Sequence, residues 1–188
     1  MGIIRCIPGM TIISPSDAGQ ALKAFYASWT LNKPVYIRFT GGLNCPVIYE
    51  QEFNYQIGKG IRLREGNQIQ IIATGSMVDR ALKAAKILEE KEISVDVVDM
   101  HTIKPLDTDI LKKDVKLVVS VEEHSIIGGL GSAIAEALST YSVHAPLLRL
   151  GIGDYFSQVG EYEYLLEQHG LSPEPVSYTH LRAHETLS

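Results

Sequence analysis

From residue 68 onward, short apolar runs alternate with segments of helical periodicity, and this alternation restricts the fold more than any other feature of the sequence. The apolar runs are residues 69–73, 95–100 and 117–121. Between the first two, residues 77–91 place Val78, Ala81, Leu82, Ala85 and Leu88 on one helical face. Strands that are apolar throughout and separated by amphipathic helices are typical of a parallel sheet covered on both faces. We therefore predict an α/β fold in which residues 68–176 form a three-layer α/β/α sandwich with a mostly parallel sheet.

The first 49 residues show a shorter version of the same pattern. The run 11–14 predicts a strand, residues 15–17 open a helical segment, and residues 35–39 predict a second strand. Ser16 is expected to cap the helix, and Asn32 to end it. So few strands are expected to form an incomplete layer, with unpaired edges and partly exposed apolar side chains. Those side chains are Ile12, Ile13, Val35, Ile37 and Phe39.

Loop-forming residues separate the two patterns. They are a Gly/Pro cluster at 41–46, a polar segment at 49–60 and the turn at 65–67. We therefore divide the chain into a first part at 1–49, a linker at 50–67 and a domain at 68–176. The last twelve residues, 177–188, show no apolar face and resemble translated adaptor sequence. We therefore interpret them as a non-native tail and expect them to pack poorly.

Composition excludes several classes of protein. The formal net charge is -5, and no run of Lys or Arg forms the basic stripe that nucleic acids require. Every apolar stretch is far shorter than the roughly 20 residues that cross a bilayer. The amino terminus lacks the pattern of a secretory signal, so a cytoplasmic location is expected. Cys6 and Cys45 stand apart, with no His at metal-ligand spacing, which indicates reduced thiols and no metal site.

Several motifs, in this order, resemble the transketolase family. RCIPGM at 5–10, SPSD at 14–17 and PVYIR at 34–38 look like the end of its pyrimidine-binding domain, and residues 57–66 are similar to the linker that follows. ATGSMV at 73–78, HTIKPLD at 101–107, VEEH at 121–124 and GGLGSA at 128–133 resemble signatures of the transketolase C-terminal domain. The resemblance covers residues 1 to about 176. It implies a partial pyrimidine-binding α/β domain followed by the C-terminal domain.

The resemblance also implies an activity. Transketolases move a two-carbon ketol unit between sugar phosphates with thiamine diphosphate and Mg²⁺, and this chain is most similar to those made of two separate chains. An amino-terminal transketolase subunit and homodimer contacts are therefore the implied partners. Deoxyxylulose-phosphate synthase and the beta subunit of 2-oxoacid dehydrogenases share the architecture and stay open as alternatives.

The same resemblance places the catalytic groups elsewhere. The family binds its metal and diphosphate with a Gly-Asp-Gly motif, but here Tyr155 follows Gly153 and Asp154. The Glu that activates the cofactor belongs to an earlier part of the pyrimidine-binding domain. No catalytic, cofactor-binding or metal-binding residue is therefore expected, and the chain is expected to be inactive alone.

One substrate-binding residue is implied by the resemblance. Arg38 follows a strand where the family places an Arg that holds a sugar phosphate, and a guanidinium suits that task through paired hydrogen bonds. The alternative is an Arg that is paired at the sheet edge or at a domain contact. Arg5 also resembles a family Arg, for which we expect a structural contact.

A glycine-rich turn, Gly128-Gly129-Leu130-Gly131, precedes a predicted helix. Free amides and the helix dipole at such a turn favour an anion, whereas glycines also permit a tight turn and close packing without any ligand. We favour the second interpretation. Glu122, Glu123 and His124 come just before the turn, where parallel sheets often carry functional groups, and we expect a structural or interface role for them. His101 and Lys104 are expected to anchor a loop.

Two further classes of function remain. A free-standing module could bind a nucleotide through the glycine turn, but no acidic residue ends a second strand of a Gly-x-Gly-x-x-Gly unit. A non-catalytic dimerisation or assembly domain is the other alternative.

Overall fold

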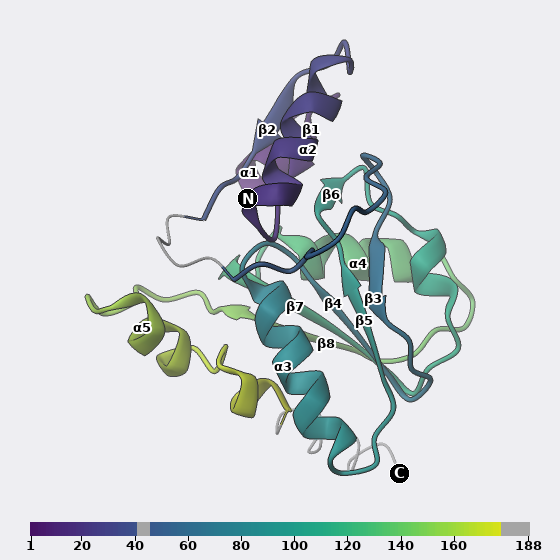
Figure 1. Cartoon of the computed structure of the whole chain (residues 1–188), viewed down its shortest axis with the longest axis vertical. Helices are drawn as coiled ribbons and strands as arrows, with labels where there is room; N and C mark the ends of the chain where they lie inside the picture. Colours follow the sequence, from purple (N-terminus) through teal and green to yellow (C-terminus); the bar gives the residue numbers. More distant parts are fainter. Residues whose placement is uncertain (41–45, 178–188) are drawn as a thin grey trace.

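The computed structural model describes residues 1–40 and 46–177, and these residues form two sheets (Figure 1). The larger sheet has the strand order β3-β5-β4-β7-β8. Its strands are β3 (Ile61–Arg64), β4 (Ile69–Ala73), β5 (Val95–Asp99), β7 (Leu117–Ser125) and β8 (Leu147–Ile152). Four of them run parallel, and β3 runs antiparallel to β5 at one edge. The predicted mostly parallel sheet is confirmed.

Helices cover both faces of this sheet. The helix α3 (Met77–Glu89) packs on one face, together with Leu166 of α5 (Tyr162–Gln168). The helix α4 (Leu130–Leu138) and the short helix η1 (Asp109–Lys112) pack on the other face. Every residue of β4 and β5 is buried, which explains why these strands are apolar runs. The three-layer sandwich is therefore the observed architecture.

The smaller sheet joins the first part of the chain to the sandwich. It contains β1 (Thr11–Ile13), β2 (Val35–Ile37) and β6 (Thr102–Lys104), and it is preceded by α1 (Gly2–Arg5). The helix α2 (Ala18–Trp29) packs against β2. β1 lies in the middle, parallel to β2 and antiparallel to β6. Residues 102–104 were expected to belong to a loop, so β6 corrects that prediction.

The pairing of β1 with β6 also corrects the exposure expected for the first part. Ile12 and Ile13 are completely buried, and Ile12 belongs to the same core cluster as Ile134 of α4. Val35 and Ile37 are half-buried, whereas Phe39 is 63% exposed. The first part thus covers the sandwich through β1, while Phe39 and apolar side chains of α1 and α2 stay exposed.

Two predicted ends of α2 shift by one or two residues. Asp17, not Ser16, is the N-cap, because its Oδ1 atom accepts a hydrogen bond from the backbone of Gln20 at 2.7 Å. The helix ends at Trp29, with Thr30 as its C-cap, instead of at Asn32. Ser16 is occupied elsewhere, since its hydroxyl donates to Asp99.

The predicted linker contains the edge strand β3. Arg62 of this strand pairs with Asp96 of β5 at 2.8 Å, and the Asp96 side chain is fully buried. An ion pair between an edge strand and its neighbour fixes the edge in place. Residues 50–67 therefore contribute a strand to the sandwich in addition to connecting its parts.

The carboxyl-terminal tail is described only at its first residue. Ser177 is buried, and its hydroxyl donates to the carbonyl of Glu174 at 2.7 Å. Residues 178–188, to which most of the predicted poor packing applies, lie outside the described residues, as does Cys45. Cys6 is an exposed free thiol.

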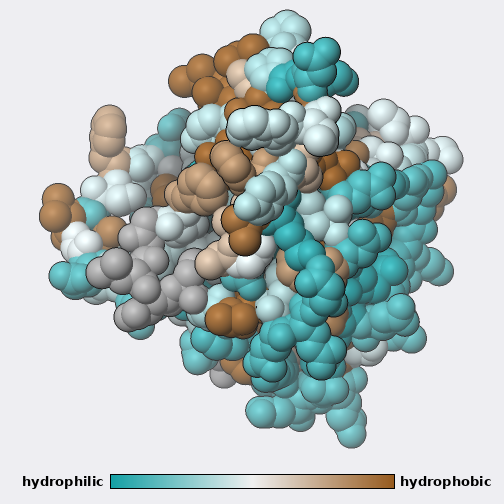
Figure 2. Space-filling model, turned by 45° about the horizontal axis from the view of Figure 1, so that its top comes forward, coloured by the Kyte–Doolittle hydropathy of each residue, from teal (hydrophilic) through white to brown (hydrophobic). Residues whose placement is uncertain are grey.

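The surface differs between the two parts of the molecule. Figure 2 shows hydrophobic residues gathered over the end formed by α1, α2 and β2, while hydrophilic residues dominate the sandwich below it. Large apolar side chains exposed on α2 include Leu22, Phe25, Tyr26 and Trp29. Within residues 1–40 and 46–177, no helix is long and apolar enough to cross a membrane.

Candidate functional site

The strand order has a topological switch point between β4 and β7. The chain leaves β4 through α3 toward β5 on one side, and it leaves β7 through α4 toward β8 on the other side. Open parallel sheets bind ligands at such a point, where successive connections depart in opposite directions. Ser76 follows β4 there, and Glu122 and Glu123 follow Val121, the last residue of β7 that pairs with β4. This switch point is the candidate functional site.

Arg38 reaches the switch point from the smaller sheet. Its backbone nitrogen donates to Ile13 at 2.8 Å, which extends the pairing of β1 with β2. Its Nη2 atom lies 2.8 Å from Oε1 of Glu123, and the side chain is 24% exposed. The structure therefore gives Arg38 the paired contact that was its alternative role, while the open part of the side chain leaves the predicted phosphate role untested.

Glu123 holds contacts from three separate segments. Its Oε2 atom accepts hydrogen bonds from the hydroxyl of Ser76 at 2.5 Å and from that of Tyr162. Burial, and then the bond to Glu123, raise the pKa of Tyr162. The sequence analysis missed Tyr162, because nothing in its local pattern indicates a contact with β7. The carboxylate of Glu123 is thus the centre of the site.

A second ion pair fastens α5 beside this cluster. The Nη2 atom of Arg80, on α3, donates to both carboxylate oxygens of Glu163, each at 2.8 Å. This ion pair ties α5 to α3. Because Glu163 is the neighbour of Tyr162, the ion pair holds the start of α5 where the Tyr162 hydroxyl meets Glu123.

The glycine turn before α4 already holds an anion, which is a carboxylate of the chain itself. Glu122 is fully buried, and its oxygens accept hydrogen bonds from the amides of Leu130 at 2.6 Å and Gly131 at 2.9 Å. A Cβ atom on Gly129 would lie 2.0 Å from Oε2 of Glu122, so the glycine permits this approach. His124 lies 2.6 Å from the same carboxylate. The structure favours the packing role of the glycines over a nucleotide or phosphate cradle.

A second buried cluster, which the sequence did not predict, joins the first part to β5. The donors to Oδ2 of Asp99, each at 2.8 Å, are Ser16 Oγ, Gln20 Nε2 and Tyr49 Oη. Burial raises the pKa of Asp99 to about 6, although these hydrogen bonds oppose the shift. Burial also raises the pKa of Tyr49. The cluster fastens α2 and the segment at Tyr49 to the sandwich.

His101 and Lys104 have anchoring contacts. The His101 ring stacks on Tyr55 with 4.3 Å between centroids, and burial lowers its pKa to about 4. Lys104 Nζ donates to the carbonyls of Arg5 and Ile7, each at 2.8 Å. The Arg5 guanidinium in turn binds Glu136 and the carbonyl of Gly128. These contacts tie the first residues to β6 and α4, as structural roles require.

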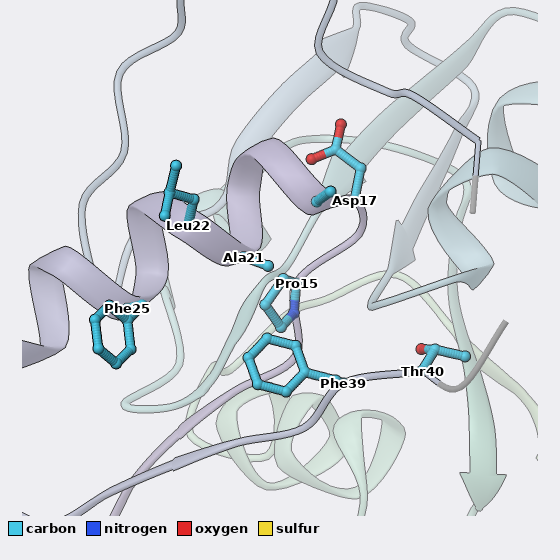
Figure 3. Close-up of a pocket in the computed structure, with 8 residues that line it drawn as sticks. Pro15, Asp17, Ala21, Leu22, Phe25, Phe39 and Thr40 are labelled. Atoms are coloured by element: carbon cyan, nitrogen blue, oxygen red, sulfur yellow. The ribbon is translucent and has the colours of Figure 1, made fainter. Parts of the chain in front are cut away.

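An apolar groove of about 460 Å³ lies on the far side of the smaller sheet. Figure 3 shows the rings of Pro15, Phe25 and Phe39 turned toward the same hollow, with the carboxylate of Asp17 pointing away from it. That carboxylate accepts hydrogen bonds from three backbone amides, those of Gln20, Ile48 and Tyr49. The groove therefore offers apolar contact and does not suit a sugar phosphate. Among the residues that the structure describes, no group of three or more His, Cys, Asp or Glu is placed to hold a metal ion.

Comparison with known proteins identifies the family. The transketolase C-terminal domain family matches residues 58–176. A putative transketolase C-terminal section from Methanocaldococcus jannaschii is 41% identical over 179 residues, which cover 94% of this chain and 56% of that protein. A 1-deoxy-D-xylulose-5-phosphate synthase from Caldanaerobacter subterraneus subsp. tengcongensis is 35% identical over 190 residues, which cover 100% of this chain and 30% of that protein.

A solved structure agrees with the sequence comparisons. A split-gene transketolase, described as an inactive beta4 tetramer, matches with a TM-score of 0.82 and 34% identity over 94% of this chain and 57% of that chain. The chain thus spans little more than half the length of this structure and of the M. jannaschii relative, and less than a third of the synthase. The resemblance noted in the sequence is confirmed: the chain belongs to the transketolase C-terminal domain family.

Proposed function

We propose that this chain is the carboxyl-terminal section of a transketolase-type enzyme that moves a two-carbon ketol unit between sugar phosphates together with an amino-terminal subunit. The observation that carries the proposal is the likeness, over 94% of the chain, to a transketolase C-terminal section and to a split-gene transketolase. Both relatives are described as parts of a divided enzyme. That division supports a partner subunit for this chain. The tetrameric state of the split-gene transketolase supports contacts between copies of this chain.

Arg38 is the residue that we assign to the substrate. Its guanidinium pairs with Glu123 at the switch point after β4 and β7, where parallel sheets receive ligands, and its side chain is partly open to solvent. A phosphate monoester accepts two parallel N–H hydrogen bonds from a guanidinium, which fixes one end of an extended sugar chain. In this role, Arg38 orients the sugar and takes no part in breaking bonds.

Thiamine diphosphate and Mg²⁺ fit poorly to the described residues. The cofactor supplies a thiazolium carbon that stabilises a carbanion, and it needs a cradle for its diphosphate. The glycine turn before α4, the cradle-like feature singled out in the sequence, is filled by the carboxylate of Glu122, which would repel a diphosphate. We therefore assign the cofactor to the partner subunit and derive no step through it.

A deoxyxylulose-phosphate synthase is the second candidate. The observation in its favour is the 35% identity to such a synthase over the whole chain. Its product also carries a phosphate, so Arg38 would have the same task. The DNA on both sides of this reading frame distinguishes the two candidates, because a separate gene for an amino-terminal section supports the divided transketolase.

A chimera tests the proposal. In the chimera, residues 1–176 replace the matching part of the M. jannaschii section. The chimera is then combined with the amino-terminal section of that enzyme, thiamine diphosphate and Mg²⁺. We name this complex the assembled enzyme. Transfer from xylulose 5-phosphate to ribose 5-phosphate is the expected result. A chimera that folds and binds the amino-terminal section but transfers nothing would contradict the proposal and favour an assembly domain without a catalytic role.

A further inference from the structure

The segment that leads from β8 into α5 presents large apolar side chains to solvent. Phe156 and Val159 are completely exposed, and Tyr155, Tyr162 and Tyr164 are exposed over 41–61% of their surface. Figure 1 shows this part of the chain projecting from the sandwich on the side of α3. We name residues 154–164 the aromatic segment. Exposed apolar residues gathered in this way are typical of a surface that binds another protein.

We propose that the aromatic segment is the surface by which this chain binds the amino-terminal subunit, and that Phe156 inserts into an apolar pocket of that subunit with Lys or Arg at its rim. The inference rests on the proposed partnership with an amino-terminal subunit. It adds the place of contact on this chain and the chemistry that the partner must present.

The backbone on both sides of Phe156 is held by one ring. The hydroxyl of Tyr155 lies 2.9 Å from Nδ1 of His169, and that of Ser157 lies 2.8 Å from Nε2 of the same ring. The Tyr155 ring also stacks on His169, with 5.4 Å between centroids. A side chain that is already fixed in its exposed position loses less conformational entropy when it binds. Phe156 is therefore prearranged as an anchor.

Glycines at two positions permit this conformation. A Cβ atom on Gly153 would lie 2.5 Å from the Tyr155 ring, and one on Gly160 would lie 2.7 Å from the Tyr164 ring. Both tyrosine rings thus fold back onto the backbone, where only glycine leaves room for them. The exposed arrangement is held by these close contacts and does not result from a lack of contacts.

The charge around the aromatic segment determines the kind of partner. Residues 153–168 contain no Lys or Arg, and the exposed carboxylates among them include Asp154, Glu161 and Glu167. Two copies of this chain that met through this face about a twofold axis would bring like charges together. An apolar pocket with a basic rim is complementary to the segment. The charge therefore favours a different chain over a second copy.

The aromatic segment is continuous with the switch point of the larger sheet. Tyr162 is 41% exposed on the surface, and its hydroxyl donates to Glu123 at the end of β7. A subunit bound to the segment would consequently lie against the carboxyl edge of the sheet. A standard interface buries about 800 Å² on each partner, so the aromatic segment would form the centre of the contact and its carboxylates the rim.

Isothermal titration of the chimera with the amino-terminal section of the assembled enzyme tests the apolar contact. Phe156→Ala should raise Kd about 10- to 100-fold, because a central aromatic anchor carries much of the binding energy. Its melting temperature should stay within about 1 °C of wild type, since the side chain is fully exposed in the free chain. Val143→Ala is the matched control, because Val143 is 88% exposed in a different loop, and its Kd should stay within about twofold.

A second pair of variants tests the charge. Asp154→Asn combined with Glu161→Gln should raise Kd about 3- to 10-fold at roughly 50 mM salt and should weaken the dependence of Kd on salt. Glu90→Gln combined with Asp114→Asn removes the same charge from exposed positions before the amino ends of β5 and β7, and it should leave Kd within about twofold.

The outcomes separate this inference from the function on which it rests. If wild type and Phe156→Ala bind the amino-terminal section equally well, the partnership stands and the aromatic segment is not its contact. If Phe156→Glu leaves this binding unchanged but reduces self-association in light scattering, the segment binds a second copy and the inference is wrong. A folded wild-type chimera that binds no amino-terminal section would refute the partnership, and the inference with it.

Discussion

The carboxylate of Glu122 lies 2.6 Å from the backbone nitrogen of Leu130, at the first turn of α4. A second amide, that of Gly131, binds the other oxygen at 2.9 Å. A negative charge at this end of a helix is favoured by the unpaired amides and by the helix dipole. The contact explains why a glycine-rich turn precedes α4 without any ligand: the glycines admit a side chain of the preceding strand.

Gly129→Ala should therefore destabilise the protein. The new Cβ atom would lie 2.0 Å from Oε2 of Glu122, and that side chain is buried and held by two amides. We expect a loss of about 2–3 kcal/mol in the free energy of unfolding and a melting temperature lower by roughly 5–10 °C. Differential scanning calorimetry measures both quantities.

Gly19→Ala provides the matched control. Gly19 is exposed in α2, and a Cβ atom there meets nothing closer than Asp17 Oδ1 at 3.5 Å. Alanine favours the helix over glycine, so this variant should gain up to about 1 kcal/mol. Equal and small effects of the two substitutions would show that Glu122 is not held against Gly129.

The buried carboxylate of Asp99 predicts a pH dependence of stability. Its folded pKa is raised from 3.8 to about 6, so the folded state favours the protonated form. Stability from this group is greatest below pH 4 and is lost as the pH rises through about 6. Between pH 4.5 and 7.5, wild type should lose about 2 kcal/mol relative to Asp99→Asn, which does not titrate.

Urea unfolding of wild type and Asp99→Asn at these two pH values measures the sign of this change in the free energy of unfolding. His101, whose pKa is lowered to about 4, opposes the effect in each protein and cancels in the comparison. If wild type gained stability relative to Asp99→Asn as the pH rises, the raised pKa of Asp99 would be contradicted.

The exposed apolar face of α2 predicts association of residues 1–176. Leu22 is 57% exposed and Phe25 is 48% exposed, and both line the apolar groove. Size-exclusion chromatography with light scattering should show dimers or larger species, which Leu22→Glu combined with Phe25→Glu should convert to monomers. Val143→Glu replaces an exposed apolar residue elsewhere and should change nothing. A wild-type monomer would show that this face does not drive self-association.

The buried parts of the fold could be predicted because the side chains on each buried face all lie in the apolar core. Strands β4 and β5 are buried on both faces and α3 is buried on one face. The spacing of apolar residues along the sequence therefore matches the observed elements. Edge strands were harder to identify. The strand β3 alternates Ile61 and Leu63 with two arginines, a period of two that the surrounding polar residues obscured. Pairing of β6 with β1 joins residues about 90 positions apart, which no local pattern records.

Some residues of the candidate site could be predicted from the sequence, but the contacts between them could not. The positions of Arg38 and Glu123 at strand ends follow from the periodicity, but their contact depends on how two sheets meet. Tyr162 lies on a short helix of seven residues, most of them exposed, which gives a weak amphipathic signal. Its hydroxyl is placed by the packing of Leu166 in the core below.

In the enzyme that we propose, the partner subunit binds the cofactor and this chain binds a substrate phosphate. Isothermal titration of residues 1–176 with thiamine diphosphate in the presence of Mg²⁺ tests that division most directly, with thermal unfolding to show that the sample is folded. We predict no measurable heat of cofactor binding for these residues alone, and binding once the assembled enzyme is formed. Micromolar binding to residues 1–176 alone would contradict the account, because these residues would then contain the cofactor site that it assigns to the partner.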